Sequence, residues 1–185
     1  MKYLIGLFIL ISLSAGAVLG GLLMVFWKWG QDLPDYSQLA KYEPPVATRV
    51  YAGNGALLAE FAAQKRLFVP VKAMPPQLLH AFLSAEDKSF FTHPGVDPVA
   101  LVRASLTNIA ALGTGRRPIG ASTITQQVAK NFLLTNELSF DRKIKEAILA
   151  IRMERAFSKQ QILALYLNEI YLGYGSFGVG AAALN

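Results

Sequence analysis

The stretch Glu86-Asp87-Lys88-Ser89-Phe90-Phe91-Thr92-His93-Pro94-Gly95 places two adjacent carboxylates beside aromatic side chains, a histidine and a Pro-Gly break. An apolar run precedes it, in which Leu78, Leu79, Phe82 and Leu83 recur at spacings of three and four. This spacing is typical of one face of an α-helix. We therefore expect a helix that opens at Pro76 and ends near the two acids, so that polar side chains gather at its end.

The chain after this stretch also has the pattern of helices. Asp97 is a candidate N-cap for a helix with Pro98 in its first turn, and Ser139 and Ser158 are candidate caps for two later helices. Another helix is expected from about Ser122 to Leu134. The sequence thus predicts a mainly α-helical fold for its second half.

The region before Pro75 has a different pattern. Residues 48–51 and 57–61 flank Gly53-Asn54-Gly55, and two short apolar segments around such a turn predict a β-hairpin. Residues 67–71 are a candidate third strand. A small β-hairpin region is therefore expected in front of the helices.

Residues 3–27 carry no charged side chain and are rich in Leu, Ile, Val and Gly. A helix of this length would extend roughly 37 Å, enough to cross a hydrocarbon core of about 30 Å. A cleaved signal peptide is the alternative, since Ala15-Gly16-Ala17 resembles a cleavage site, but its apolar core would be only about 7–15 residues long. We expect a transmembrane signal-anchor at residues 1–30, a linker at 31–47 that adds nothing to the core, and one domain at 48–185.

Composition limits the class of protein. The chain has 185 residues, a net charge of +6 and no cysteine. Without cysteine it has no disulfides and no Cys-ligated zinc or iron–sulfur cluster. Residues 116–155 hold eight basic and four acidic side chains, an excess that suits nucleic acid, anionic lipid headgroups or a phosphorylated substrate. An exported domain on a membrane anchor argues against nucleic acid.

The first candidate site residue is Glu86, on a helical face shared with apolar side chains. A carboxylate in such a place is a candidate proton acceptor. The alternative is that Glu86 and Asp87 are surface acids that pair with Lys88. The two phenylalanines of the stretch are interpreted as core residues. His93 is interpreted as a structural turn residue, with a catalytic role as the alternative.

A second group of polar side chains lies in Gly120-Ala121-Ser122-Thr123-Ile124-Thr125-Gln126-Gln127. Ser122, Gln126 and Lys130 are spaced four apart and would share one helical face, with Gln127 beside it. Amides and a lysine near a helix N-terminus can bind phosphate or sugar hydroxyls. The alternative is that Ser122 is only an N-cap and both glutamines are solvated.

A third group, Arg142, Lys143 and Glu146, lies on a helical face away from three isoleucines of the same helix. One interpretation is an exposed ion pair worth roughly 0.3–0.5 kcal/mol. The other is a pair of cations for a pyrophosphate together with a second carboxylate.

These segments, in this order, resemble the peptidoglycan glycosyltransferase domain (glycosyltransferase family 51) of class A penicillin-binding proteins and monofunctional transglycosylases. The resemblance covers about residues 48–185, and five motifs in register make it specific. The motifs are Glu86-Asp87-x-x-Phe90-x-x-His93-x-Gly95, Gly120 to Gln127 with Lys130-Asn131, Arg142-Lys143-Ile144-Lys145-Glu146, Lys159-x-x-Ile162-Leu163-x-x-Tyr166-Leu167-Asn168 and Tyr171-x-Gly173-x-Gly175.

The resemblance implies a mainly α, lysozyme-like glycosyltransferase domain behind a single transmembrane helix, on the outer, periplasmic side of the bacterial inner (cytoplasmic) membrane. It implies polymerisation of lipid II, by inverting transfer of the glycan from undecaprenyl pyrophosphate to the acceptor 4-hydroxyl. The implied partners are lipid II, the growing glycan strand, the membrane and the cell-wall synthesis machinery.

The resemblance also implies residue roles. Glu86 would be the general base and Glu146 a second catalytic carboxylate, near the pyrophosphate. A divalent metal, Mg²⁺ or Mn²⁺, is an implied cofactor near Glu146. The implied donor-binding residues are Ser122, Gln126, Gln127, Lys130, Arg142 and Lys143.

The chain departs from the family pattern in two ways. Ala121 stands where the family usually has Gly, and no Ser-x-x-Lys motif occurs, so we expect no penicillin binding by this chain. The chain ends inside what reads as a helix, which predicts a fragment of a longer protein. Two other functions stay open: a non-catalytic membrane-tethered protein that binds glycan or lipid II, and a lytic enzyme acting on finished peptidoglycan.

Overall fold

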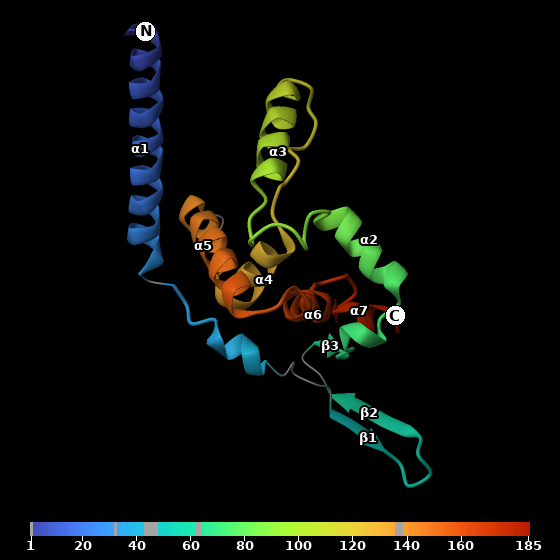
Figure 1. Cartoon of the computed structure of the whole chain (residues 1–185). Helices are drawn as coiled ribbons and strands as arrows, with labels where there is room; N and C mark the ends of the chain where they lie inside the picture. The colour runs from blue at the N-terminus through green and yellow to red at the C-terminus, as the bar shows by residue number, and fades with distance from the viewer. Residues whose placement is uncertain (1, 32, 43–47, 62–63, 136–138) are drawn as a thin grey trace.

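The computed structural model describes residues 2–31, 33–42, 48–61, 64–135 and 139–185. It is mainly helical (Figure 1), which confirms the predicted fold class. The elements in chain order are α1 (Lys2–Gly30), η1 (Ser37–Lys41), β1 (Thr48–Tyr51), β2 (Leu57–Phe61), β3 (Lys65–Arg66), η2 (Val71–Ala73), α2 (Pro76–Glu86), α3 (Pro98–Ala110), α4 (Ile124–Leu133), α5 (Phe140–Ala156), α6 (Lys159–Glu169), β4 (Ser176–Phe177) and α7 (Val179–Ala182).

The hydrophobic core lies where α4 packs against both α5 and α6. Each of the three helices contributes side chains that are fully shielded from solvent, among them Ile124, Leu149 and Leu167. The apolar face of α2 covers this core from one side. Because α4 and α5 are fixed by the core, the polar side chains in their first turns are held in place.

Three predicted helix caps are confirmed. The Asp97 carboxylate accepts a hydrogen bond from the amide of Ala100 at the start of α3. The hydroxyls of Ser139 and Ser158 accept hydrogen bonds from backbone amides in the first turns of α5 and α6. Such caps satisfy amides that have no partner within the helix.

The cap of α4 differs from the expectation by one residue. Thr123, and not Ser122, is the N-cap, and it forms a reciprocal capping box with Gln126. Ser122 therefore precedes the helix, and the expected face shared by Ser122 and Lys130 does not exist. The shift leaves the Ser122 hydroxyl available for a contact outside α4.

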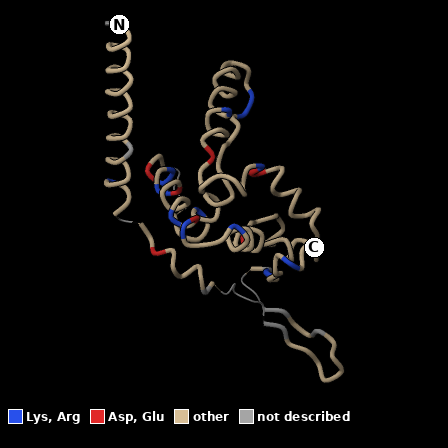
Figure 2. Tube along the Cα trace, viewed as in Figure 1, with Lys and Arg blue, Asp and Glu red and all other residues tan. Residues whose placement is uncertain are grey.

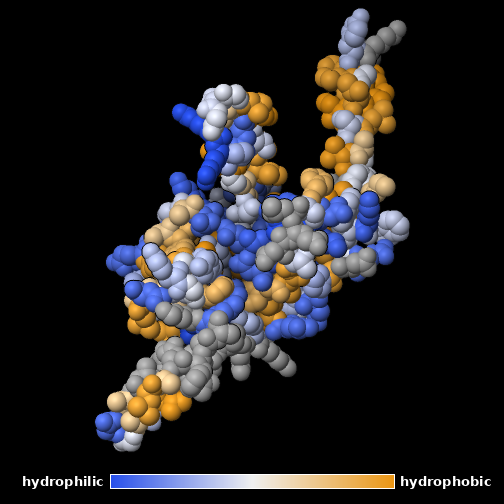
Figure 3. Space-filling view, turned by 180° about the vertical axis from the view of Figure 1, so that it is seen from behind, coloured by the Kyte–Doolittle hydropathy of each residue, from blue (hydrophilic) through white to orange (hydrophobic). Residues whose placement is uncertain are grey.

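Helix α1 is long and apolar enough to cross a membrane, and its side chains form an exposed hydrophobic surface (Figure 3). Its last turn is tied to α5. The indole Nε1 of Trp29 donates to Asp141 at 3.1 Å, and the Arg152 guanidinium donates to the carbonyl of Gly30 at 2.9 Å. The end of the apolar helix is thus held against the helical domain.

The linker prediction is wrong for part of its length. Leu39 of η1 is only 8% exposed and belongs to the core, and Leu33 and Tyr36 pack against it. The Tyr36 ring meets the edge of Phe157 at 6.3 Å between centroids. Periodicity could not reveal this contact, because a single 3-10 turn is too short to show a pattern. Residues 32 and 43–47 of the expected linker lie outside the described residues.

The predicted β-hairpin is confirmed: β1 and β2 pair antiparallel, with Thr48 opposite Phe61. The hairpin extends away from the helices (Figure 1). The candidate third strand at residues 67–71 does not form, and β3 pairs instead with β4 in parallel. At Val69 the side-chain amide of Asn168 takes the place of a strand, accepting from the Val69 amide at 2.8 Å and donating to its carbonyl at 3.0 Å.

Candidate functional site

The adjacent carboxylates of Glu86 and Asp87 lie in different surroundings. Glu86 is the last residue of α2, is exposed, and accepts one hydrogen bond, from the Gln127 side-chain amide at 2.8 Å. Asp87 is only 7% exposed. It accepts from His93 Nε2 at 2.9 Å and from the backbone amide of Ile124 at 3.0 Å. The interpretation of both acids as surface residues is therefore wrong for Asp87, and Glu86 is the carboxylate open to a ligand.

His93 has a structural position. Its Nδ1 accepts a hydrogen bond from the Gly95 amide, so Nε2 bears the proton that it donates to Asp87. This pair ties the loop after α2 to the first turn of α4. Of the two phenylalanines expected in the core, Phe90 is fully buried, whereas Phe91 is 54% exposed.

The loop packs directly on α5 at Gly95. This residue has a φ of +101°, and a Cβ placed there would lie 2.6 Å from the carbonyl oxygen of Ala150. The Thr123 hydroxyl donates to the Gly95 carbonyl at 2.6 Å. The stretch of residues 86–95 is thus wedged between the start of α4 and the middle of α5, which positions Glu86.

The third group of candidates forms a compact ionic cluster. Glu146 is 2% exposed and pairs with Lys143 Nζ at 2.6 Å and Arg142 Nη1 at 3.0 Å. The interpretation of an exposed ion pair is therefore wrong for Glu146, which is buried. A carboxylate in such a position requires cationic partners. Lys143 also donates to the Ser122 hydroxyl at 2.7 Å, which joins α5 to the segment before α4. Figure 2 shows the concentration of Lys and Arg along α5.

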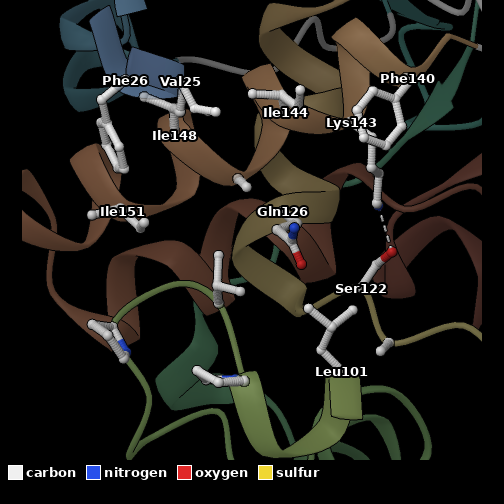
Figure 4. A pocket seen from close by; sticks show the side chains of 15 residues that line it. Val25, Phe26, Leu101, Ser122, Gln126, Phe140, Lys143, Ile144, Ile148 and Ile151 are labelled. Carbon is white, nitrogen blue, oxygen red and sulfur yellow. Dashed lines mark hydrogen bonds between the residues drawn. The ribbon is translucent and has the colours of Figure 1, made fainter. Parts of the chain in front are cut away.

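A polar cavity of about 290 Å³ opens between the end of α2 and the start of α4. Glu86, Arg103 and Ser122 all line it. Ser122 lies in addition on a second, apolar cavity together with Lys143 (Figure 4). The segment before α4 therefore lines the cavity of Glu86 and also contacts the ionic cluster through Ser122. Arg103 is a cation that the sequence analysis missed, since nothing in its spacing distinguishes it from a surface residue.

The other predicted binding residues have distinct positions on α4. Gln126 is buried, and its side-chain carbonyl accepts from the Thr123 amide within the capping box. Gln127 orients Glu86. Lys130 is half-buried one turn further along α4, and no hydrogen bond or ion pair of its ammonium group is found among the residues that the structure describes. The structure thus brings together Glu86 with Gln127, and Ser122 with the ionic cluster, and it bonds the Lys130 ammonium to neither group.

A second, partly buried ionic network lies where α4, α5 and α6 meet the loop after α2. Lys159 donates to Glu154 and to the carbonyl of His93, each at 2.7 Å, and Thr125 donates to Glu154 at 2.5 Å. The sequence analysis assigned no contact to this lysine. The network connects α4, α5 and α6 to the loop after α2, so it holds the residues around Glu86.

The residues around Glu146 do not fit a divalent metal. Both carboxylate oxygens of Glu146 are already paired with cations. Within the part of the chain that the structure describes, no group of three His, Cys, Asp or Glu side chains is placed to hold a metal ion. Mg²⁺ and Mn²⁺ require several oxygen ligands, and a cation there would be repelled by Arg142 and Lys143. We therefore derive no step through a protein-bound metal.

Comparison with known proteins identifies the family. Residues 54–185 match the family model described as Transglycosylase. The chain belongs to this transglycosylase family. The resemblance that the five motifs indicated is thereby confirmed.

The relatives of this transglycosylase include penicillin-binding proteins 1A. The protein of Rickettsia felis is 54% identical over 161 residues, which are 87% of this chain and 20% of that protein. The protein of Aquifex aeolicus is 47% identical over 167 residues, 90% of this chain and 23% of that protein. The protein of Escherichia coli K12 is 43% identical over 173 residues, which are 94% of this chain and 20% of that protein. The chain thus spans about a fifth of the length of these relatives.

Proposed function

We propose that this transglycosylase is a peptidoglycan glycosyltransferase that polymerises lipid II. The glycan would pass from undecaprenyl pyrophosphate to the 4-hydroxyl of the incoming lipid II, with inversion at the reacting carbon. The observation that supports this most is the arrangement of one accessible carboxylate, Glu86, and one cationic cluster on either side of Ser122. Inversion needs a base on one face of the sugar and charge stabilisation on the other.

Glu86 is the candidate general base. It is exposed to the polar cavity, and among the described residues only Gln127 donates a hydrogen bond to its side chain, which leaves acceptor positions for an incoming hydroxyl. Asp87 is unsuited to this role, because it is buried and its oxygens accept from His93 and Ile124. The hydroxyl proton would pass to Glu86 as the oxygen attacks the donor carbon.

The ionic cluster is the candidate site of the departing pyrophosphate. Arg142 and Lys143 outnumber Glu146, so the cluster holds one net positive charge. The Nε of Arg142 is buried and has no hydrogen-bond partner among the described residues; a donor left in this state is expected to serve a ligand. Glu146 would fix the two cations, which stabilise the charge that develops as the glycosidic bond breaks. Lys130 would approach only with substrate bound.

Access to a substrate in the bilayer follows from the arrangement of α1 and α3. Both helices extend to the same side of the molecule (Figure 1). α3 is largely exposed and presents apolar side chains to solvent, namely Val99, Leu101, Val102, Leu106 and Ile109. We place the chain as a single-pass protein of the bacterial inner membrane, with the helical domain on the periplasmic side, where lipid II and the glycan strand meet it.

The test is turnover of lipid II by the full-length protein carrying Glu86→Gln. We expect loss of at least about 100-fold in kcat, the range of a general base, with unchanged thermal unfolding. Asp35→Asn is the matched control, because Asp35 is an exposed acid whose hydrogen bonds, among the described residues, come from Ser37. Near-normal polymerisation by Glu86→Gln would reject the role of this residue.

The lipid II assay and a cell-wall digestion assay together separate the other two functions. A wild-type protein that binds lipid II and forms no polymer would favour a binding scaffold. Release of soluble fragments from finished cell walls would favour a lytic enzyme.

A further inference from the structure

The Tyr166 hydroxyl is buried without a hydrogen-bond partner. Tyr166 lies on α6, is only 1% exposed and belongs to the hydrophobic core. Among the residues that the structure describes, no group donates to its hydroxyl or accepts from it. A buried hydroxyl in this state lowers the stability of the fold, and a phenylalanine would fill the same space without that cost. Packing therefore explains the ring of Tyr166 but does not explain its hydroxyl.

The ring of Tyr166 packs against the helix that ends at Glu86. It meets the Phe82 ring edge to face, at 6.1 Å between centroids and an angle of 79° between the ring planes. Phe82 and Glu86 both lie on α2, and their i, i+4 spacing places the two side chains on one helical face. Tyr166 thus contacts α2 one turn before the candidate base, on the face that the base shares.

The charge of Glu86 acts on the Tyr166 hydroxyl. Burial, and then the negative charge of Glu86, raises the pKa of Tyr166. The hydroxyl therefore keeps its proton at neutral pH, and a protonated hydroxyl can donate to a carboxylate. The Tyr166 hydroxyl and the Glu86 carboxylate are thus a matched donor and acceptor on neighbouring helices.

Glu86 has one carboxylate oxygen left for such a bond. Gln127 of α4 donates to Glu86 Oε2 at 2.8 Å, and within the described part of the chain no group donates to Oε1. Glu86 is exposed at the end of α2, so its side chain can turn toward α6. Two donors on different helices would hold the carboxylate in one orientation, which a single donor does less well.

We propose that Tyr166 is a positioning residue for Glu86, and that its hydroxyl donates to Glu86 Oε1 when the acceptor sugar fills the polar cavity. A bound sugar would exclude water there and so strengthen a hydrogen bond to the carboxylate. Glu86 would then be fixed by α4 through Gln127 and by α6 through Tyr166. The inference rests on the proposed function, because it concerns the alignment of the candidate base. It also explains why a hydroxyl that lowers stability is present in the core.

The first test compares Tyr166→Phe with the wild type, as full-length proteins acting on lipid II. We expect kcat to fall about tenfold and KM to change by less than twofold, while the midpoint of thermal unfolding stays equal or rises. Tyr42→Phe is the matched control, because it removes a hydroxyl that donates to Glu169. The control should unfold at a lower temperature and keep its kcat.

A double-mutant cycle tests whether Tyr166 acts through Glu86. In the Glu86→Gln background, Tyr166→Phe should lower the residual rate by less than about twofold, because the carboxylate that it positions is already gone. A further tenfold loss in that background would overturn the inference. A wild-type kcat in Tyr166→Phe would also overturn it, as would a lower unfolding midpoint that accompanies the loss of kcat.

Absence of polymer with the wild-type protein would instead reject the proposed function. The contact is then measured by NMR with lipid II bound, on protein that is isotope-labelled at the glutamate carboxyl groups. The Glu86 carboxyl resonance should shift in Tyr166→Phe and stay at its wild-type position in Tyr42→Phe. An unchanged Glu86 resonance in Tyr166→Phe would contradict the contact itself.

Discussion

The Gln127 side-chain amide donates a hydrogen bond to Glu86 at 2.8 Å, across 41 residues of sequence. This contact joins α4 to the end of α2. It also gives Gln127 a role that differs from direct substrate binding, because the amide holds the carboxylate that we propose as the base. The consequence can be measured.

Gln127→Ala should lower kcat for lipid II about tenfold and change KM by less than twofold. The reason is that a loosely held base loses its alignment with the acceptor hydroxyl while the binding surfaces remain. Steady-state kinetics with the full-length protein provides the measurement. A rise in KM with unchanged kcat would mean that Gln127 contacts the substrate.

Asp87→Ala should destabilise the domain by about 3 kcal/mol, because it leaves buried donors of His93 and Ile124 without an acceptor. Glu86→Gln is its natural comparison. It changes the neighbouring carboxylate, which is exposed, and should alter the free energy of unfolding by less than about 0.5 kcal/mol. Urea unfolding of both variants measures the difference. Equal stabilities would contradict the assignment of Asp87 as the structural acid and Glu86 as the accessible one.

Gly95→Ala should cost more than about 2 kcal/mol of stability. The new methyl group would clash with backbone atoms of Ala150, and the φ of +101° is unfavourable for alanine. Gly53→Ala is the control, since Gly53 lies in the hairpin turn with open space around it and no positive φ. Thermal unfolding should separate the two variants clearly, and a stable Gly95→Ala protein would refute the close packing of this loop on α5.

Tyr166, which is buried, and Tyr42, which is half-buried, should respond differently to loss of their hydroxyl groups. The Tyr166 hydroxyl has no hydrogen-bond partner among the residues that the structure describes, and burial followed by the nearby charge of Glu86 raises the pKa of Tyr166. Tyr166→Phe should therefore be neutral or stabilising. Tyr42 donates to Glu169 at 3.0 Å, so Tyr42→Phe should cost about 1 kcal/mol.

Tyr42 also predicts an alkaline transition. Burial, and then the charge of Glu169, raises the pKa of Tyr42 to about 12. The folded pKa is thus above the unfolded value of about 10. The stabilisation is complete below about pH 10 and is lost as the pH rises through 12. Unfolding measured over this range should show a smaller decline for Tyr42→Phe, and identical declines would count against the contact.

Asp97 predicts the opposite dependence at acid pH. Its hydrogen bond from the Ala100 amide lowers the pKa of Asp97. Stability from this cap is present above the unfolded pKa of about 3.9 and is lost as the pH falls through the lower folded value. Asp97→Asn keeps a good cap but cannot titrate, so its stability should decline less between pH 4 and pH 2. Equal acid unfolding curves would show that Asp97 does not titrate in this way.

Local chemistry was sufficient for the longer helices and the hairpin, and for the choice of most candidate residues. The helices at Pro98, Phe140 and Lys159 could be predicted because caps and apolar spacing act over one or two turns. The hairpin could be predicted from its glycine turn. The candidate residues were recognisable by their chemical type, since few side chains can accept a proton or neutralise a pyrophosphate.

The environment of each candidate depended on contacts between distant segments. Glu86 and Asp87 are adjacent and chemically alike, yet burial against α4 makes one structural and leaves the other accessible. The Ser122 hydroxyl is available to accept a hydrogen bond from Lys143 because Thr123, and not Ser122, caps α4. The contact of α1 with the apolar cavity, through Val25 and Phe26, could likewise not be predicted from the sequence. Burial and charge pairing depend on distances in space, and the folded chain sets these by packing segments that are far apart in sequence.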